Sequence, residues 1–355
     1  MRYNFLVCRW IFFSMMLATM VSAQSNRPTR EDVECRCGES LNRFGVSYRM
    51  GFNISARFKN LGGFAAQSNP GPATNGVDHI YDDGYNRVDS STNAANSTWF
   101  WGYQNASQLP GNDTLVMNSS SSAAKNTSKN QEEDPQHGLE ITYNRQLGRM
   151  GECKWGMEAA FGFTDVTIHD NGTLFGNVTR ISDAYALGGT IAPGAPYNHG
   201  RDPSGSDPLI SDVPIRMMNT ISRGAVVNGQ RKFDSEIYGL RVGPYLEIPL
   251  CERVSLSLSG GFALLSVNSD FKFQENVTIS GVGTTKRKGG GSHSEWLPGG
   301  YFGGNFNYAV AKNVNVFAGA QYQAAGTYSH QESGKKAELD LGGSVFANLG
   351  VGFSF

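Results

Sequence analysis

The carboxyl-terminal stretch from residue 337 to residue 355 constrains the fold of this chain more than any other part of the sequence. From Leu339 onward every second residue is apolar or glycine, and the residues between are mostly polar or small. The residues of this face are Leu339, Leu341, Gly343, Val345, Ala347, Leu349, Val351, Phe353 and Phe355. A period of two is typical of a β-strand, and ordinary strands are about 5 to 6 residues long. Because this alternation is much longer and its apolar face carries no charge, it predicts a strand that faces lipid.

The final residues carry a second pattern, in which a polar residue and a glycine are followed by two aromatic residues at alternate positions. These residues are Asn348, Gly350, Phe353 and Phe355. They resemble the terminal assembly signal of bacterial outer-membrane β-barrel proteins. The resemblance implies that the barrel-insertion machinery of an outer membrane recognises them during assembly. An ordinary closing strand of a soluble β-protein is the alternative interpretation.

The amino terminus has the features of a secretory signal. Arg2 and Arg9 precede an apolar run from Trp10 to Val21, and small residues end at Ala23. This pattern predicts a signal peptide over residues 1–23 that is removed on export. No later segment offers the ~20 consecutive apolar residues of a spanning helix. A mature chain that crosses a membrane must therefore do so as a closed barrel.

The composition agrees with a β-protein and narrows the range of partners. The 44 glycines and 21 phenylalanines favour a turn-rich β-fold over a helical one. A formal net charge of −1 predicts no nucleic-acid partner. The segment Asp82–Gly84 has too few spaced oxygen ligands for a calcium loop. We therefore expect neither a metal site nor a cofactor.

Alternation of the same kind recurs along the chain and divides it into eight predicted strands. In the first, the even positions from Phe44 to Phe58 are apolar, while Arg49, Arg57 and Lys59 lie on the other face. The other predicted strands cover residues 139–147, 155–163, 238–248, 254–264, 302–310, 314–322 and 339–355. Their connections alternate between long and short, as expected of a membrane barrel with long extracellular loops and short periplasmic turns.

This arrangement resembles the OmpA-type eight-stranded barrels, which implies an all-β fold in the form of an antiparallel transmembrane β-barrel. The predicted organisation is a signal peptide at 1–23, a periplasmic lead-in at 24–42 and the barrel at 43–355. Long loops are expected at about 61–136 and 171–230. Because these loops are longer than such barrels usually carry, ten or twelve strands also fit the sequence. Short β-like pieces at 80–88, 97–104 and 114–119 are then either a projecting hairpin or a further pair of barrel strands.

With the apolar face turned to lipid, the charged residues of the other face are predicted to line the lumen. They are Arg49, Arg57, Lys59, Glu140, Glu158, Arg241, Glu247, Arg253, Glu338 and Asp340. We expect Arg49, Glu158 and Glu247 to meet at one level. Where the first and last strands adjoin, Arg57 and Lys59 should face the two carboxylates of the last strand. The interior of an eight-stranded barrel is just wide enough for side chains, so a packed ion-pair core is favoured over a gated pore.

Four cysteines remain in the exported chain, and they are predicted to lie on the periplasmic side. Cys35 and Cys37 precede the first strand, while Cys153 and Cys251 flank two short turns. A bond between Cys35 and Cys37 would close a very tight ring. In an oxidising compartment we therefore expect two disulfides that join the lead-in to the two turns.

Three functions are compatible with such a barrel in the bacterial outer membrane. The favoured one is a non-enzymatic protein that anchors large surface loops, for envelope integrity or for contact with an unidentified surface ligand. A porin-type channel for small solutes is the second, and it needs an open lumen. A barrel hydrolase is the third, suggested by Ser292, His293 and Glu295, although adjacent strand residues point to opposite faces. Outer-membrane lipids and lipopolysaccharide are the expected partners, the latter through Lys286–Lys288.

Changing both Phe353 and Phe355 to Ser is predicted to prevent insertion, because the terminal aromatic residues resemble what the insertion machinery recognises. The variant should be exported but missing from the outer-membrane fraction, which cell fractionation and heat-modifiable gel migration measure. Normal amounts of the variant in that membrane would contradict the barrel assignment.

Overall fold

Nearly every regular element in the structure is a β-strand. The computed structural model describes residues 41–67, 71–73, 76–88, 96–198 and 208–355, so the predicted signal peptide and the lead-in up to residue 40 lie outside these ranges. Within them one 3-10 turn, η2 (Ala106–Gln108), accompanies the strands. The strand pairs are antiparallel, so the predicted all-β antiparallel fold is confirmed. No helix in the described residues is long and apolar enough to cross a membrane.

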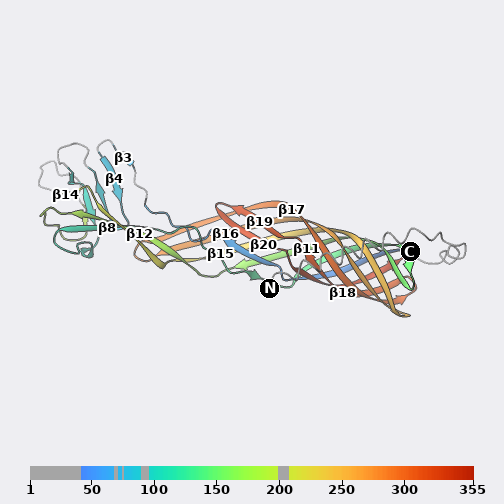
Figure 1. Cartoon of the computed structure of the whole chain (residues 1–355). Helices are drawn as coiled ribbons and strands as arrows, with labels where there is room; N and C mark the ends of the chain where they lie inside the picture. The colour runs from blue at the N-terminus through green and yellow to red at the C-terminus, as the bar shows by residue number, and fades with distance from the viewer. Residues whose placement is uncertain (1–40, 68–70, 74–75, 89–95, 199–207) are drawn as a thin grey trace, which may run out of the picture.

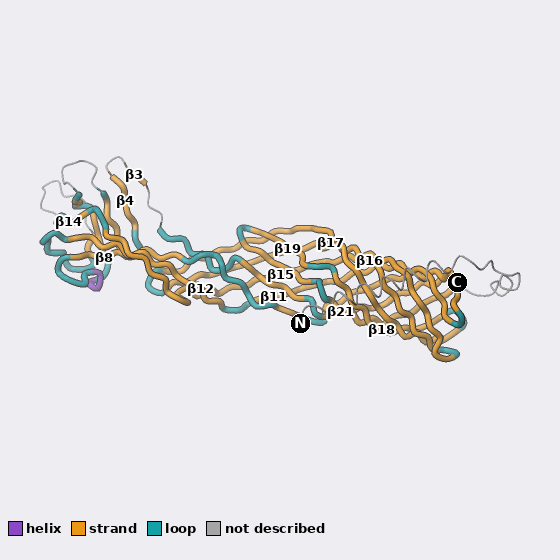
Figure 2. Tube along the Cα trace, viewed as in Figure 1, coloured by secondary structure: helices purple, strands orange, loops and turns teal. Residues whose placement is uncertain are grey.

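The molecule is elongated and has three parts (Figure 1). A β-barrel lies at the end that holds the carboxyl terminus, a narrower stalk continues it, and a head lies at the far end. Strands make up most of the barrel and the stalk, whereas loops are most frequent in the head (Figure 2). The strands thus carry the chain away from the barrel over much of the length of the molecule.

Eight strands form the barrel, and each is hydrogen-bonded to two neighbours. In spatial order they are β1 (Asn42–Phe52), β10 (Gln136–Met150), β11 (Cys153–Asp170), β15 (Ile215–Cys251), β16 (Val254–Ile279), β17 (Gly283–Ala311), β18 (Val314–Ala324) and β21 (Ser344–Ser354). The pairings of β11 with β15 and of β21 with β1 close the ring. Closure gives partners to backbone groups that would otherwise meet lipid unpaired.

Short turns join the strands at one end of the barrel, here called the turn end. Residues 151–152 connect β10 to β11, residues 252–253 connect β15 to β16, and residues 312–313 connect β17 to β18. In the first turn Gly151 has a φ of 63°, a left-handed conformation that glycine adopts without steric cost. The carboxyl terminus lies at the same end, where Asn42 and Phe355 exchange backbone hydrogen bonds.

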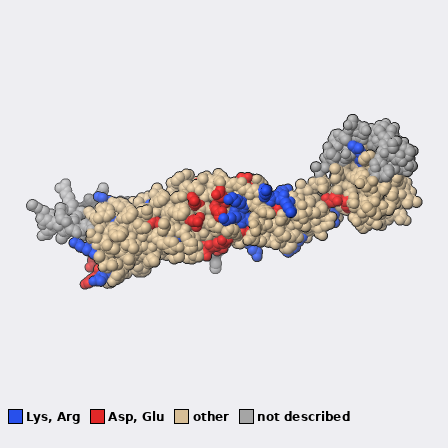
Figure 3. All heavy atoms as spheres, turned by 180° about the vertical axis from the view of Figure 1, so that it is seen from behind, with Lys and Arg blue, Asp and Glu red and all other residues tan. Residues whose placement is uncertain are grey.

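Outward-facing side chains of the ring form an apolar belt. Its members include Val46, Leu139, Phe161, Leu240, Phe262, Phe302 and Leu349, of which Phe262 is 80% exposed. On the face drawn in Figure 3 the wall of the barrel is almost free of charged side chains. An aromatic row made of Phe163, Tyr238 and Trp296 borders the belt toward the stalk. An apolar band with aromatic borders is typical of the lipid-facing wall of a membrane barrel.

Three strands are far longer than a membrane crossing requires, and their outer parts build the stalk. β15, β16 and β17 contain 37, 26 and 29 residues, whereas a spanning strand needs about 9–11. The expectation of a loop over 171–230 was therefore wrong for β12 (Leu174–Ala186) and for the first residues of β15. The segment Lys286–Gly291, which falls between the predicted strands at 254–264 and 302–310, lies within β17. The apolar face of β16 changes from even positions such as Phe262 and Leu264 in the barrel to odd positions such as Val267 and Phe271 in the stalk, so the predicted strand ended where the phase changes.

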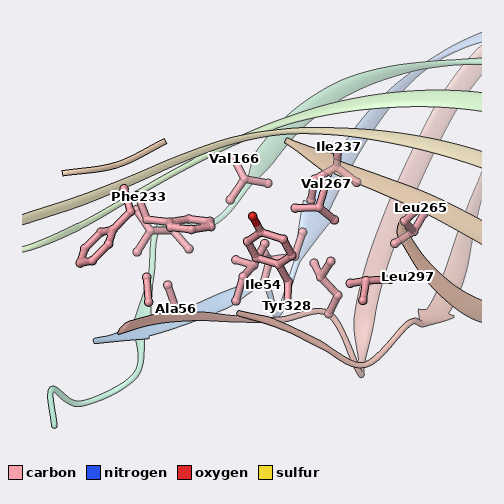
Figure 4. Close-up of a cluster of buried hydrophobic side chains, with 14 of the residues drawn as sticks. Ile54, Ala56, Val166, Phe233, Ile237, Leu265, Val267, Leu297 and Tyr328 are labelled. Atoms are coloured by element: carbon pink, nitrogen blue, oxygen red, sulfur yellow. The ribbon is translucent and has the colours of Figure 1, made fainter. Parts of the chain in front are cut away.

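A second, four-stranded sheet packs against these long strands. Its order is β19 (Thr327–Glu332), β20 (Lys335–Asp340), β2 (Ser55–Lys59) and β9 (Gln131–Glu132). The two layers enclose a hydrophobic core, shown in close-up in Figure 4, that includes Ile54, Phe58, Phe233, Phe271, Tyr328 and Leu339. Each fully buried large side chain contributes roughly 1.5–3 kcal/mol. The stalk is therefore a β-sandwich with a core of its own.

The two longest alternations of the sequence each span two strands with different surroundings. The chain changes direction at Asn53, whose φ is 59°, and beyond it Ile54 and Phe58 are buried in the sandwich. Leu339 is buried there as well, whereas Val345 in β21 faces outward. The prediction that these runs face lipid along their whole length was wrong. A period of two shows that one face is apolar but not whether lipid or protein covers it.

The head contains the short β-like pieces of the sequence. One sheet has the order β13 (Tyr197–Asn198), β7 (Trp101–Tyr103), β5 (Gly84–Arg87), β4 (Gly76–Ile80) and β3 (Gly71–Ala73), while β14 (Ile210–Ser211) pairs with β6 (Ser97–Thr98). A ribbon of β8 (Thr114–Ser121), β12 and β15 joins the head to the stalk. The core of the head includes Tyr81, Trp101, Tyr103 and Tyr185. The pieces at 80–88, 97–104 and 114–119 are thus parts of the head and not additional barrel strands.

Candidate functional site

Four charged side chains form a network in the lumen of the barrel. They come from four neighbouring strands: Arg49 from β1, Glu140 from β10, Glu158 from β11 and Arg241 from β15. Each points inward because its position alternates with lipid-facing residues. Glu140 is at the centre, with its Oε2 3.1 Å from Arg49 Nη1 and its Oε1 2.6 Å from Arg241 Nη2. Arg241 Nη1 lies 3.7 Å from Glu158 Oε1.

The network is electrically balanced and almost completely buried. The side chains of Arg49, Glu140 and Arg241 are 4%, 2% and 4% exposed. Two cations therefore face two carboxylates in an interior with little water. A buried ion without a partner costs several kcal/mol, so the balance of charge lowers the cost of burying these four groups together.

Amide side chains complete the network at its edges. Asn144 donates a hydrogen bond to Glu158 Oε2 at 2.9 Å, and Arg49 donates one to Gln323 at 3.3 Å. Gln321 in turn donates to Gln323 at 3.2 Å. These contacts extend the network from β10 and β11 to β18 on the far side of the ring.

Aromatic rings cover both guanidinium groups. The guanidinium carbon of Arg49 lies 3.7 Å from the ring centre of Phe346, and that of Arg241 lies 4.4 Å from the ring centre of Tyr301. The cavity that remains beside the network has a volume of about 20 Å³, which is room for about one water molecule. Side chains therefore fill the lumen at this level, as expected in an eight-stranded barrel.

A second ion pair lies near the turn end. Arg43 Nη1 is 3.0 Å from Glu247 Oε2, and Ser255 donates a hydrogen bond to the other carboxylate oxygen at 2.8 Å. The pair is partly exposed and borders a cavity of about 270 Å³. The prediction that Glu247 meets Arg49 and Glu158 was wrong, because Glu247 lies nearer to the turn and pairs there with Arg43.

Two arginines near the turn end differ from the expectation. Arg43 was missed because the first predicted strand began at Phe44, yet its odd number places it on the same inward face as Arg49. Parity along the strand is the signal that could have found it. Arg253 was expected in the lumen but lies in the turn between β15 and β16, where it is exposed and lines the turn-end cavity.

The charged residues at the junction of the first and last predicted strands lie outside the lumen. Arg57 is opposite Glu338 in the β2–β20 pair, and Lys59 Nζ is 2.6 Å from Glu338 Oε2. Arg57 also donates a hydrogen bond to Asn130 at 2.7 Å, and Asp340 accepts one from the backbone of residue 342 at 2.9 Å. The structure thus brings these groups together, but on the solvent face of the second sheet. The lumen assignment was wrong for them because the chain leaves the ring at residue 53.

The residues of the terminal signal occupy both faces of β21. Phe353 and Phe355 are 49% and 64% exposed on the outside, whereas Asn348 is 7% exposed and points inward. A side chain at Gly350 would collide with the ring of Phe317 and with the neighbouring backbone. Gly350 is therefore needed for close packing of β21 in the ring, and the role of the four residues in assembly stays a prediction.

Cys153 and Cys251 lie at the turn end, at the start of β11 and the end of β15. They are not bonded to one another. Their predicted partners Cys35 and Cys37 lie outside the described residues, so the two disulfides between the lead-in and the turns stay a prediction.

A serine and a histidine from different strands meet in the sandwich core. Ser269 Oγ on β16 is 2.9 Å from His330 Nδ1 on β19 and 2.7 Å from Tyr328 Oη. Ser269 and His330 are 5% and 2% exposed. Ser292, which the sequence singled out, instead donates a hydrogen bond to Asp270. The only pairing that resembles a nucleophile and its base is therefore, among the described residues, a buried one.

Replacing Glu140 by Ala should destabilise the barrel strongly, because it leaves two buried arginines without their shared carboxylate. We expect a loss of about 3–5 kcal/mol in the free energy of unfolding. Glu247→Ala is the matched control, since it removes a carboxylate from a partly exposed pair worth about 0–1 kcal/mol. Urea unfolding of the refolded barrel measures both. Equal stability of the two variants would contradict a dry, ion-paired lumen.

The stalk should lose stability in acid because of His330. Burial lowers the pKa of His330, the neighbouring His293 lowers it further, and Glu332 and Asp270 only partly oppose this. A histidine whose pKa is lower in the folded state destabilises that state as the pH falls through its unfolded value of about 6.5.

The backbone amides of β19 and β20 should therefore be better protected against hydrogen exchange at pH 7.5 than at pH 5, when each observed rate is divided by the intrinsic exchange rate at the same pH. In His330→Gln, which cannot titrate, the difference between the two pH values should shrink. An identical pH response of wild type and variant would assign the effect to other groups.

No family model and no curated protein matches the sequence. Solved structures that align with the chain include Ail, the attachment invasion locus protein of Yersinia pestis, at 11% identity and a TM-score of 0.27, covering 89% of this chain and 99% of that chain. Neisserial surface protein A aligns at 11% identity and a TM-score of 0.24, covering 90% and 99%. The outer membrane protease OmpT from Escherichia coli aligns at 8% identity and a TM-score of 0.26, covering 90% and 98%.

All three TM-scores are low, so the fold assignment rests on the strand pairings of the chain itself. The antiparallel ring, its apolar belt and its short turns at one end give this chain the fold of a bacterial outer-membrane β-barrel.

Proposed function

We propose that this protein is a non-enzymatic barrel of the bacterial outer membrane that holds a stalk and a head away from the cell surface. Its role is envelope integrity or contact with ligands and other surfaces. The turn end faces the periplasm, because the short turns of such barrels are periplasmic. Outer-membrane lipids surround the apolar belt, and lipopolysaccharide surrounds the base of the stalk.

The filled lumen is the observation that supports this proposal most. A porin-type channel for small solutes needs a lumen that holds water. Here Glu140 and its two arginines occupy the cross-section and leave a cavity of only about 20 Å³. A barrel closed in this way is suited to anchoring and not to conduction.

The construction of the stalk supports a display role. Arg231 Nη1 is 2.6 Å from Asp170 Oδ2, and Lys335 Nζ is 2.7 Å from Glu275 Oε1, with all four side chains at most 2% exposed. Lys335 also donates a hydrogen bond to the carbonyl of Asn60 at 2.9 Å. Removing either member of a buried pair leaves an unpaired charge. The Lys335–Glu275 pair joins β20 to β16 and so links the two sheets of the stalk, whereas Arg231 and Asp170 pair across neighbouring strands of one sheet.

A hydrolytic function is the second candidate, and the Ser269–His330 pair is the observation that favours it. A nucleophile must be reached by its substrate, whereas Ser269 is 5% exposed inside the sandwich core. A hydrolytic activity that disappears in Ser269→Ala without loss of folding would establish this candidate over the anchoring role.

The proposal predicts a barrel that does not conduct ions and a head that is accessible from outside the cell. In planar bilayers the refolded wild type should give no steady conductance, whereas Arg49→Ala combined with Glu140→Ala should open a small ion path while keeping the charge balanced.

An epitope tag between Gly188 and Gly189, which are exposed in the head, should bind antibody on intact cells. A tag after Gly151, exposed at the turn end, is the matched control and should bind only after permeabilisation. Large steady conductance of the wild type, or the reverse pattern of tags, would overturn the proposal.

A further inference from the structure

The outer face of the stalk carries charge in separate bands. Cross-strand register stacks side chains in rows over β11, β15, β16 and β17, beginning at the aromatic row. The next two rows are acidic and contain Asp165 with Glu236 and then Asp234 with Asp270. Three further rows follow. The first contains Lys232 and Lys272. The second contains Gln230, Gln274 and Lys288, and the third contains Asn228, Asn276 and Lys286. The last three rows are here called the lysine–amide face.

The lysines of this face are placed in a way that folding stability does not favour. Lys232 lies directly opposite Lys272, and like charges in this position destabilise a sheet. Lys232 is compensated by Asp234, 2.8 Å away. Lys272, Lys286 and Lys288 are exposed and have no ion-pair partner within the part of the chain that the structure describes. Three positive charges are therefore available to an external anion.

Most of the other side chains of the lysine–amide face are amides, and His169 of β11, which contacts Glu133, lies opposite Lys232. Gln230 is opposite Gln274, and Asn228 is opposite Asn276. Amides both donate and accept hydrogen bonds, and Gln230 and Gln274 are exposed. Sugar hydroxyls have the same dual character. Among the described residues these three rows contain no Phe, Tyr or Trp, side chains on which the bases of a nucleic acid stack, and the ring of His169 contacts Glu133.

The height of the face above the membrane excludes lipid headgroups as its partner. Lys288 is eight residues from Trp296 along β17, and at ~3.3 Å per residue and a tilt of about 35–45° it lies roughly 20 Å beyond the aromatic row. The headgroup layer of a bilayer is only about 5–8 Å deep. The nearer acidic row, Asp165 with Glu236, lies at that depth and repels phosphates. An anion at the lysines must therefore come from a molecule that extends beyond the headgroups.

We propose that the lysine–amide face binds an acidic polysaccharide, a chain of sugars that carries sulfate or phosphate groups. Lys272, Lys286 and Lys288 bind the anionic groups, and the paired amides bind the hydroxyls between them. This inference rests on the proposed surface role, because it needs the stalk to point outward in the cell. Binding itself is independent of the lumen and can be measured on purified protein.

The test measures binding of dextran sulfate to the protein in phosphatidylcholine nanodiscs. Neutral dextran and a single-stranded oligodeoxythymidine are the comparison probes. Wild type should bind dextran sulfate, more weakly as salt rises, and should not bind neutral dextran. Lys272→Gln combined with Lys288→Gln should weaken this binding about tenfold or more. Lys129→Gln combined with Lys312→Gln is the matched control, since both lysines are exposed elsewhere, and it should bind as wild type.

Three results would overturn the inference: no binding of dextran sulfate by wild type, equal weakening in the control variant, or binding of the oligodeoxythymidine as tight as that of dextran sulfate. The last would assign the face to polyanions in general. Because conductance and tag accessibility are not involved, a failure here leaves the proposed anchoring role intact, and a failure of that role leaves the binding result interpretable.

Discussion

Closure of the β-ring is the constraint on which the rest of this structure depends. A strand edge in a bilayer has no water to bind its backbone groups, so the first and last strands of the ring must meet. They do so over the whole length of β21, from Arg43 opposite Ser354 to Phe52 opposite Val345. Once the ring is closed, each strand position is either outside or inside. The apolar belt and the charged lumen follow from that one division.

The lumen of the ring and the stalk both bury inward-facing side chains, but with different kinds of contact. The lumen is narrow, so its polar side chains must satisfy one another, and Glu140 does this by facing two arginines at once. The stalk has a second sheet to cover its long strands, so it buries Phe58 and Phe271 as an ordinary apolar core. Buried ion pairs reappear there, as in Lys335 with Glu275. Buried ion pairs thus hold strands in place in both the lumen and the stalk.

The candidate residues show how far sequence reasoning reaches. Parity correctly turns Arg49, Glu140 and Arg241 inward, because alternation along a strand is a local property. Which of them pair depends on the register between strands, and the expected partner of Arg49 was wrong for that reason. Ring closure correctly predicted that Arg57 and Glu338 are neighbours. It did not predict that they lie outside the lumen, because their strands leave the barrel before reaching them.

The sequence by itself determined that this chain forms an antiparallel barrel, where its turns lie, and which faces of its strands are apolar. These properties depend on short-range alternation and on the rule that a membrane tolerates no open strand edge. Only the tertiary structure decided how far the strands continue beyond the lipid, and that a second sheet covers Ile54 and Leu339. The physical reason is that lipid and a protein core both accept an apolar face. Their difference lies in long-range packing, which no period in the sequence records.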